Sequence, residues 1–398
     1  MKKIRPMRQT RVLVTNARRR KAVPIIRALG KAGMEVICAD STRLAAGFYS
    51  RYCRHRFVHP PPTSSAFAKA LIRFLARNDC DVIFPLDDDV LEVVSGIRNS
   101  LPRPGALLLP KHETLVLAGD KTKLIPYAAN MGVPVPRSVV VGGETDLVRV
   151  GEIQPPVIIK PSHGSGGRGI VHVERGGSVA QTCRALVAEG RRVLVQERIP
   201  AEGEGLGYFA LYGRDRQLLA QFMHRRLREY PMEGGPSTLR EGIWDEQVAA
   251  DARRLLERLG WIGVAMVEFK RDPRDGVAKL MEINPRFWGS IALAIFSEVD
   301  FPVLAARATV GCPTEPVLEY PRGRLARWFW PGDVLHLLTS IRRGRWPRGF
   351  FRLWDRRMCY DLISINDPQP AIVLTISALL SLCDPAEWRR VLLRRGHT

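Results

Sequence analysis

A glycine-rich loop between two apolar strands is the feature that most restricts how this chain can fold. Residues 157–160 and 170–173 have the composition of strands, and the nine residues between them include four glycines. Ordering such a loop is costly unless its backbone amides gain a partner. Amides of this kind can close over phosphate oxygens, and Lys160 would then neutralise phosphate charge. A flexible surface hairpin is the alternative. A Walker A loop is excluded because no Gly-Lys-Ser/Thr follows the glycines.

Two later segments predict a metal site. Residues 263–270 and 278–286 have the pattern of two strands joined by a Pro-Arg-Asp-Gly turn. Glu282 and Asn284 are two residues apart and share one strand face, where Glu268 can meet them from the partner strand. Two carboxylates and an amide oxygen suit Mg²⁺. The alternative, a solvated strand face, fits poorly with the apolar neighbours.

The first hundred residues have the alternating pattern of a parallel α/β sheet. Strands are expected at 11–16, 35–40 and 81–85, and helices at 23–32 and 66–77. The first turn lacks Gly-x-Gly-x-x-Gly, so a dinucleotide site is not indicated. Acidic residues 87–89 follow the third strand, where they could touch a substrate. We favour the alternative, that they begin a helix, because acids stabilise that end.

The segment between these regions predicts two short helices and an adenine-binding edge. Residues 113–132 indicate a helix pair with Asp120 capping the second helix, and Lys121 in its first turn would face an anion. The apolar strand 193–199 ends in a polar stretch that offers backbone groups to a purine. Glu204 follows within reach of a ribose.

Composition sets wider limits. The 398 residues include 61 Lys and Arg against 40 Asp and Glu, a net charge of +21. This charge fits anionic substrates or an anionic membrane. It also fits a high-GC genome that encodes Arg where another would encode Lys. No zinc-finger, basic-zipper or RNA-binding signature occurs, so no nucleic-acid partner is expected. The seven cysteines are odd in number and form no Cys-x-x-Cys pair, which fits a cytoplasmic protein. The longest apolar run, 371–383, is expected to be a buried helix.

Together these motifs resemble the ATP-grasp superfamily. They are Gly-Asp-Lys121, Ile-Ile-Lys160 with its glycine loop, Gln-Glu197-Arg-Ile, Val-Glu268-Phe and Met-Glu282-Ile-Asn-Pro-Arg286. The resemblance is to the carbamoyl-phosphate-synthetase and biotin-carboxylase-like branch and to the less characterised carboxylate–amine ligases. It implies an N-terminal parallel α/β domain (1–105), an ATP-grasp domain of two α+β subdomains that clamp ATP (106–310) and a basic, Trp-rich C-terminal region (311–398).

The resemblance also implies roles for individual residues. Lys121 and Lys160 would contact the ATP phosphates, under the amides of Ser165, Gly166 and Gly167. The backbone of Glu197, Arg198 and Ile199 would read the adenine, with the donor at or near Ile199 because Pro200 has no N–H. Glu204 would hold the ribose. Glu268, Glu282 and Asn284 would bind Mg²⁺, or Mn²⁺ in its place, and Arg286 would face the transferred phosphoryl group.

The expected activity is that of an ATP- and Mg-dependent ligase. It would activate a carboxylate as an acylphosphate for attack by an amine or similar nucleophile, both small molecules. Arg225 matches a position that is a Lys in the carboxylase branch, where an arginine could clamp a carboxylate. A solvated basic face is the alternative for Arg225. The alternative function is an ATP-binding regulatory or scaffolding protein without turnover.

The C-terminal residues 322–398 combine 14 Arg, 6 acidic residues and five of the eight tryptophans. Arginine mixed with aromatic residues is typical of peripheral contact with an anionic membrane. Packing of the aromatics onto the ligase body, or a homodimer contact, is the interpretation we favour from the sequence.

Overall fold

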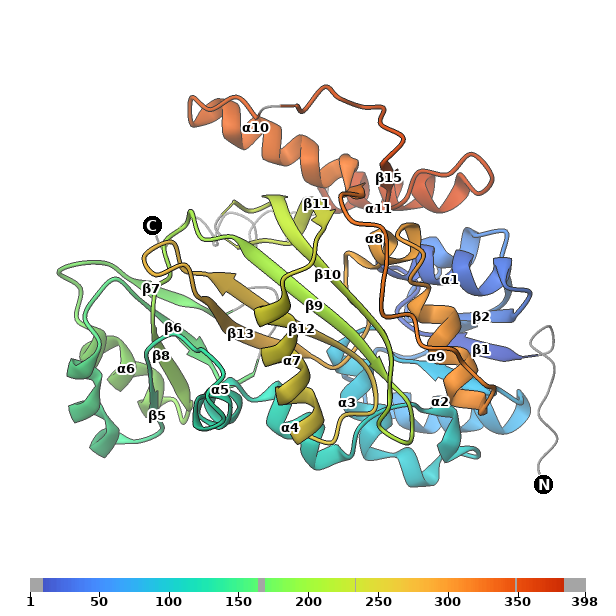
Figure 1. Cartoon of the computed structure of the whole chain (residues 1–398). Coiled ribbons are helices and arrows are strands. Elements are labelled where there is room, and N and C mark those ends of the chain that lie inside the picture. The colour runs from blue at the N-terminus through green and yellow to red at the C-terminus, as the bar shows by residue number, and fades with distance from the viewer. Residues whose placement is uncertain (1–9, 164–168, 233, 348, 383–398) are drawn as a thin grey trace.

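A computed structural model describes residues 10–163, 169–232, 234–347 and 349–382. Its strands form three sheets that follow one another along the chain, with helices packed on their faces (Figure 1). The predicted α/β fold, a parallel sheet followed by two α+β units, is confirmed. The predicted division into 1–105, 106–310 and 311–398 remains a proposal.

The first sheet is parallel, in the order β3-β2-β1-β4. Its strands are β1 (Arg11–Val14), β2 (Glu35–Asp40), β3 (Cys53–Val58) and β4 (Val82–Phe84), with helices α1 (Ala22–Lys31), α2 (Ala66–Arg77) and α3 (Asp88–Gly96) and the short turns η2 (Ala46–Tyr49), η3 (Arg98–Ser100) and η4 (Pro104–Ala106). The edge strand β3 was not foreseen, because exposed Arg and His side chains give it no apolar signal. The acidic run does begin a helix, since Asp88 and Asp89 form the first turn of α3.

The second sheet is antiparallel, in the order β5-β8-β6-β7. Its elements are β5 (Ser138–Val141), η5 (Glu144–Glu152), β6 (Val157–Pro161), β7 (Val171–Val173), α6 (Val179–Ala188) and β8 (Val193–Glu197). The helices α4 (His112–Gly119) and α5 (Lys121–Asn130) precede it. The predicted cap is confirmed, because the Asp120 side chain accepts a hydrogen bond from the Thr122 N–H at 2.9 Å.

The third sheet has seven strands in the order β13-β12-β9-β10-β11-β14-β15. They are β9 (Gly205–Tyr212), β10 (Leu218–Glu229), β11 (Ser237–Gly242), β12 (Gly263–Arg271), β13 (Ala278–Asn284), β14 (Leu325–Arg327) and β15 (Met358–Tyr360). One face packs on helix α7 (Glu246–Arg258) around the buried Trp261. The other packs, through Phe209 and Trp288, on helices α8 (Ile291–Phe296) and α9 (Phe301–Val310) and on the first sheet.

The C-terminal region joins the body through β14, β15 and helix α11 (Gln369–Leu382). The turn η6 (Phe329–Asp333) and helix α10 (Val334–Arg342) lie between the two strands in the chain. The helix predicted at 371–383 is confirmed by α11, but its expected burial is wrong. Ala371, Val373 and Leu374 pack on α1 and η2, but the opposite side of α11 is exposed. Both faces of α11 are apolar, so the sequence could not indicate which one packs. Among the described residues, no helix has the length and apolarity needed to span a bilayer.

Gly263 sets how closely the third sheet approaches the segment before α4. Its φ is +82°, and a Cβ at this position would lie 2.1 Å from the Leu108 carbonyl oxygen. We expect Gly263→Ala to lower the free energy of unfolding by at least about 2 kcal/mol, because the left-handed backbone and the clash both oppose a side chain. Thermal and denaturant unfolding would measure it.

The matched control is Gly311→Ala. Gly311 has a similar φ of +78°, but no atom lies within 4 Å of the place that a Cβ would occupy. This variant should lose only about 1 kcal/mol. Equal losses in the two variants would mean that the Leu108 contact has no energetic weight.

Candidate functional site: a half-buried carboxylate pair surrounded by cations

Two carboxylates face each other across β12 and β13. Glu268 is paired in register with Glu282. The Asn284 Nδ2 group donates to Glu268 Oε1 at 3.1 Å and to Glu282 Oε1 at 3.0 Å. The structure therefore brings together the three side chains that the sequence placed on one strand face.

The surroundings of the two carboxylates differ. Burial raises the pKa of Glu268, and the negative charge of Glu282 adds to this, while Arg226 opposes it through a direct ion pair. Burial also acts to raise the pKa of Glu282, but Lys121, Asn284 and Lys160 together outweigh burial and lower that pKa. The Lys121 Nζ lies 3.2 Å from Glu282 Oε2. Lys121 thus faces an anion, as its place in the helix suggested.

These residues fit a magnesium ion. Two close carboxylates that are shielded from water are costly without counter-charges, so the pair requires cationic partners. No three His, Cys, Asp or Glu side chains gather into a metal site in the described ranges, so a third protein ligand would be the Asn284 amide oxygen. That oxygen now accepts a hydrogen bond from Arg286 Nη2 at 3.0 Å. Turning the amide by half a rotation would present it to the metal, an orientation that hydrogen-bond assignment alone decides.

The phosphate side of the site centres on Lys160, at the end of β6. Its Nζ donates to Gln196 Oε1 at 2.7 Å, and burial lowers its pKa to about 8. The Lys121 N–H donates to the Ser162 carbonyl at 2.9 Å, so α5 is tied to the start of the glycine loop. The predicted loop residues Ser165, Gly166 and Gly167 lie outside the described residues.

The predicted adenine edge lies where β8 ends. The N–H of Glu197 donates to the Arg137 carbonyl and that of Arg198 to the Pro156 carbonyl. Ile199 is the first residue of this run whose N–H has no hydrogen-bond acceptor in the described part of the chain. The register that sequence left open therefore favours Ile199 as the donor to a purine. The side chain of Glu197, unlike its backbone, makes an ion pair with Arg274 at 2.9 Å.

The structure corrects the placement of Arg225. It lies on β10 in the same alternation as Met223, which packs in the core against α7. Its guanidinium binds Glu241 at 2.7 Å and Glu204 at 3.3 Å on that face. Arg225 and Glu204 thus lie on the sheet face opposite to Glu268, because successive strand residues point to opposite faces. Arg225 is therefore not beside the Glu268–Glu282 pair, and both its expected role as a carboxylate clamp and the ribose role of Glu204 remain predictions.

Arg226 is the residue that sequence reasoning missed. It points to the Glu268 face and pairs with Glu268 and with Glu229, the latter at 3.2 Å. The sequence of β10 does not show which side chains face the site, because Phe222 and Met223 are both buried, one on each face of the sheet. Only the register of β10 against β9, and of β9 against β12, identifies which arginine faces the site.

Arg286 connects the site to the first sheet. Its Nε and Nη2 donate to the two carboxylate oxygens of Asp88, at 2.6 and 3.0 Å. Lys21 lies 3.0 Å from Asp87 and donates to the Phe287 carbonyl. The acidic start of α3, at the carboxyl edge of the sheet, thus positions the arginine that sequence assigned to the phosphoryl group.

Comparisons with known proteins show which proteins this chain resembles. A family model described as ATP-grasp in the biosynthetic pathway with Ter operon matches residues 224–328. The carbamoyl phosphate synthase large chain of Thermomicrobium roseum is 24% identical over 273 residues, which cover 62% of this chain and 23% of that enzyme. The chain thus spans about a quarter of the length of this relative.

Two solved structures share the fold. The biotin carboxylase domain dimer of Hydrogenobacter thermophilus 2-oxoglutarate carboxylase, in complex with MgADP, ADP and bicarbonate, has a TM-score of 0.63 at 17% identity. That match covers 79% of this chain and 72% of the other. The N5-carboxyaminoimidazole synthetase of Staphylococcus aureus has a TM-score of 0.63 at 16% identity, covering 79% and 80%. These comparisons confirm the predicted resemblance to the ATP-grasp superfamily and to its carbamoyl-phosphate-synthetase and biotin-carboxylase branch.

The lowered pKa of Lys160 predicts a pH-dependent site. The pKa of about 8 means that the ammonium form is lost as pH rises through that value. We expect ATP affinity, measured by calorimetry, to fall between about pH 7 and about pH 9, because a neutral amine no longer attracts phosphate. Lys160→Arg stays charged throughout and should show no such fall. A parallel fall in this variant would assign the titration to another group.

Proposed function

We propose that the protein is an ATP- and Mg-dependent ligase that joins a carboxylate to an amine or similar nucleophile. The observation that carries the proposal is the half-buried Glu268–Glu282 pair, with Asn284 between its carboxylates and Lys121, Lys160, Arg226 and Arg286 around it. This combination offers ligands to a metal and positive charge to a polyphosphate. Both are what phosphoryl transfer requires.

Each residue of the site would have its own role in the reaction. Bound magnesium would neutralise charge on the β- and γ-phosphates. Lys121 and Lys160 would hold the phosphate oxygens, and the Ile199 N–H would orient the adenine. Arg286, fixed by Asp88, would stabilise the phosphoryl group while a substrate carboxylate oxygen attacks phosphorus and ADP leaves. A nucleophilic amine would then attack the acyl carbon of the acylphosphate, losing one proton as phosphate leaves.

Arg226 is suited to orient the substrate carboxylate. Its planar guanidinium can bind a carboxylate through two hydrogen bonds, as it now binds acidic side chains in the site. Magnesium at Glu268 would compete for that carboxylate and so release Arg226 toward a substrate. This assignment replaces the role that sequence gave to Arg225.

A second candidate is an ATP-binding regulatory or scaffolding protein without turnover. The complete set of cations beside the two carboxylates favours the ligase, since a protein that only binds ATP has no need of Arg286 or Arg226 around the γ-phosphate. The ligase proposal also includes Mn²⁺ as an alternative metal, a homodimer and a cytoplasmic location.

Acceptor-dependent ADP formation tests the proposal. Panels of carboxylates and amines would be incubated with ATP and Mg²⁺, with ADP measured by a coupled assay and products by mass spectrometry. We expect at least one pair to stimulate ADP release and to yield a condensed product. ATP binding without stimulation by any pair would favour the regulatory alternative.

Glu282→Gln should lower kcat by roughly 100-fold or more, because it removes one of the two charged metal ligands. Glu241→Gln is the matched control, since Glu241 lies on the opposite face of the same sheet and binds Arg225. It should retain activity within about threefold. Equal losses would place the active carboxylates elsewhere.

The two adjacent arginines give a second comparison. Arg226→Ala should lower kcat/KM for the carboxylate substrate by roughly 100-fold, while Arg225→Ala should change it much less. Steady-state kinetics with the carboxylate varied would measure both. A larger effect at Arg225 would contradict the face assignment.

A further inference from the structure

Exposed apolar side chains gather on one part of the molecule. Thirteen of the twenty large apolar side chains that are exposed in the described residues lie between residues 330 and 380. Trp346, Phe351, Trp354 and Ile365 are 62, 65, 89 and 95% exposed. We call the exposed side chains of residues 330–380 the C-terminal face. Exposed apolar side chains concentrated in one region mark an interaction site more often than side chains exposed singly do.

Helix α11 contributes a continuous stripe to this face. Ile372, Ile376, Leu379 and Leu380 are all about half exposed. Their spacing of three to four residues puts them on one side of the helix. The opposite side packs on the first domain. The outward stripe is therefore one side of a docked helix.

The acidic residues of this region point inward. Asp333, Asp361 and Asp367 are buried. Asp333 binds Arg228 at 2.9 Å, Asp361 binds Arg20 and Arg240, and Asp367 binds Arg27 at 2.9 Å. These ion pairs hold the region against α1 and the residues before it, and against strands β10 and β11. In the described part of residues 322–382 only one further acidic residue occurs, Asp355, which lies between Arg352 and Arg357.

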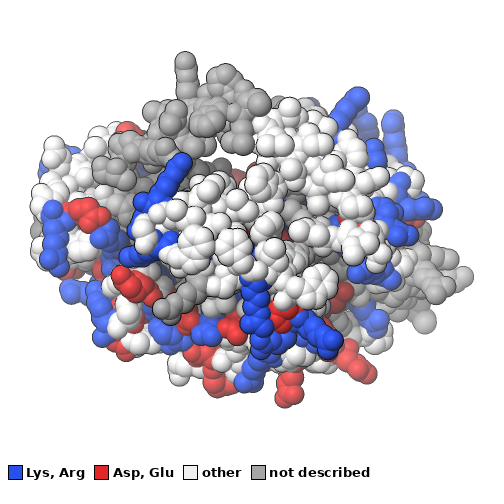
Figure 2. Space-filling view, turned by 90° about the horizontal axis from the view of Figure 1, so that it is seen from above, with Lys and Arg blue, Asp and Glu red and all other residues white. Residues whose placement is uncertain are grey.

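The outward surface is consequently cationic. Six arginines of this region are exposed beside the aromatic residues: Arg342, Arg343, Arg345, Arg352, Arg356 and Arg357. Figure 2 looks down on this side of the molecule, where uncharged side chains fill the centre, with Lys and Arg around them and Asp and Glu interspersed along the lower edge of the view. Tryptophan beside arginine is the composition that favours the headgroup zone of a bilayer.

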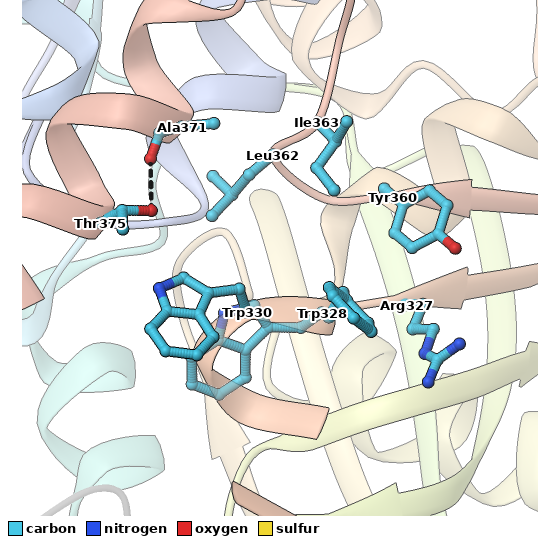
Figure 3. Close-up of a pocket in the computed structure, with 9 residues that line it drawn as sticks. Arg327, Trp328, Trp330, Tyr360, Leu362, Ile363, Ala371 and Thr375 are labelled. Carbon is cyan, nitrogen blue, oxygen red and sulfur yellow. Dashed lines mark hydrogen bonds between the residues drawn. The ribbon is translucent and has the colours of Figure 1, made fainter. Parts of the chain in front are cut away.

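A cavity of about 350 Å³ lies in the same region. Its walls come from η6, from the segment after β15 and from α11, with Trp330, Ile363 and Thr375 among the lining residues (Figure 3). Trp330 and Ile363 are also exposed on the C-terminal face. An apolar hollow beside an apolar face can take up part of an acyl chain.

We propose that the C-terminal face docks the protein on the surface of an anionic lipid bilayer. Aromatic and aliphatic side chains would enter the headgroup zone, and the arginines would bind the acidic lipids. A second copy of the chain is a poorer occupant, because two-fold contact would set this cationic face against itself. The ion pairs of the three inward aspartates hold the face in place.

Vesicle flotation of the full-length protein tests the proposal. The vesicles would be phosphatidylcholine alone, or phosphatidylcholine with phosphatidylserine or phosphatidylglycerol, at low and high salt. We expect binding to both anionic mixtures, weak binding to the neutral one and a loss of binding at high salt. Arg342, Arg343 and Arg345 changed together to Gln should weaken partitioning by roughly 100-fold at low salt.

Matched variants separate the face from general surface effects. Trp354→Ser with Ile365→Ser should reduce vesicle binding, whereas Val148→Ser should not, although Val148 is 87% exposed elsewhere. Circular dichroism would confirm that each variant folds. No binding to anionic vesicles, or equal binding by the wild type and the face variants, would overturn the proposal. So would a stable dimer in sedimentation that the face variants dissociate, which would make a second copy the occupant.

Discussion

The half-buried Glu268–Glu282 pair is the constraint on which the rest of this structure depends. Two carboxylates close together and partly shielded from water would not both stay ionised without compensation. Each sheet supports part of that compensation. The second supplies Lys160, and helix α5 beside it supplies Lys121. The third supplies Arg226, and the first holds Arg286 through Asp88. The site is therefore a meeting point of all three sheets.

The same logic extends to the C-terminal region. Its buried aspartates neutralise arginines of the body, notably Arg240 and Arg20 through Asp361. Arg240 is paired in register with Arg226 on the neighbouring strand. Ion pairs that fix the C-terminal region thus reach the strand that carries a site arginine. This connection links the surface proposed to meet a membrane with the sheet proposed to activate a carboxylate.

Local pattern predicted most elements of the fold but not all. Strands with apolar runs, such as β1 and β8, and the helix cap at Asp120 were evident from sequence. The edge strand β3 was missed because its side chains are mostly polar and exposed. The burial of α11 was wrong because a helix apolar on both sides does not reveal which side packs. These errors occur where one-dimensional periodicity carries no information about the partner.

For the site, the sequence by itself determined which side chains form the proposed metal corner. Two-residue spacing puts Glu282 and Asn284 on one face, and this follows from strand geometry alone. The tertiary structure decided which cations stand around them. The choice of Arg226 over Arg225 depends on strand register, and the contact of Arg286 with Asp88 joins residues almost two hundred positions apart. Spacing within one strand is fixed by local covalent geometry. Contacts between distant segments are fixed only by how the sheets pack. The sequence therefore indicated the proposed ligands, whereas the fold determined which cations contact them.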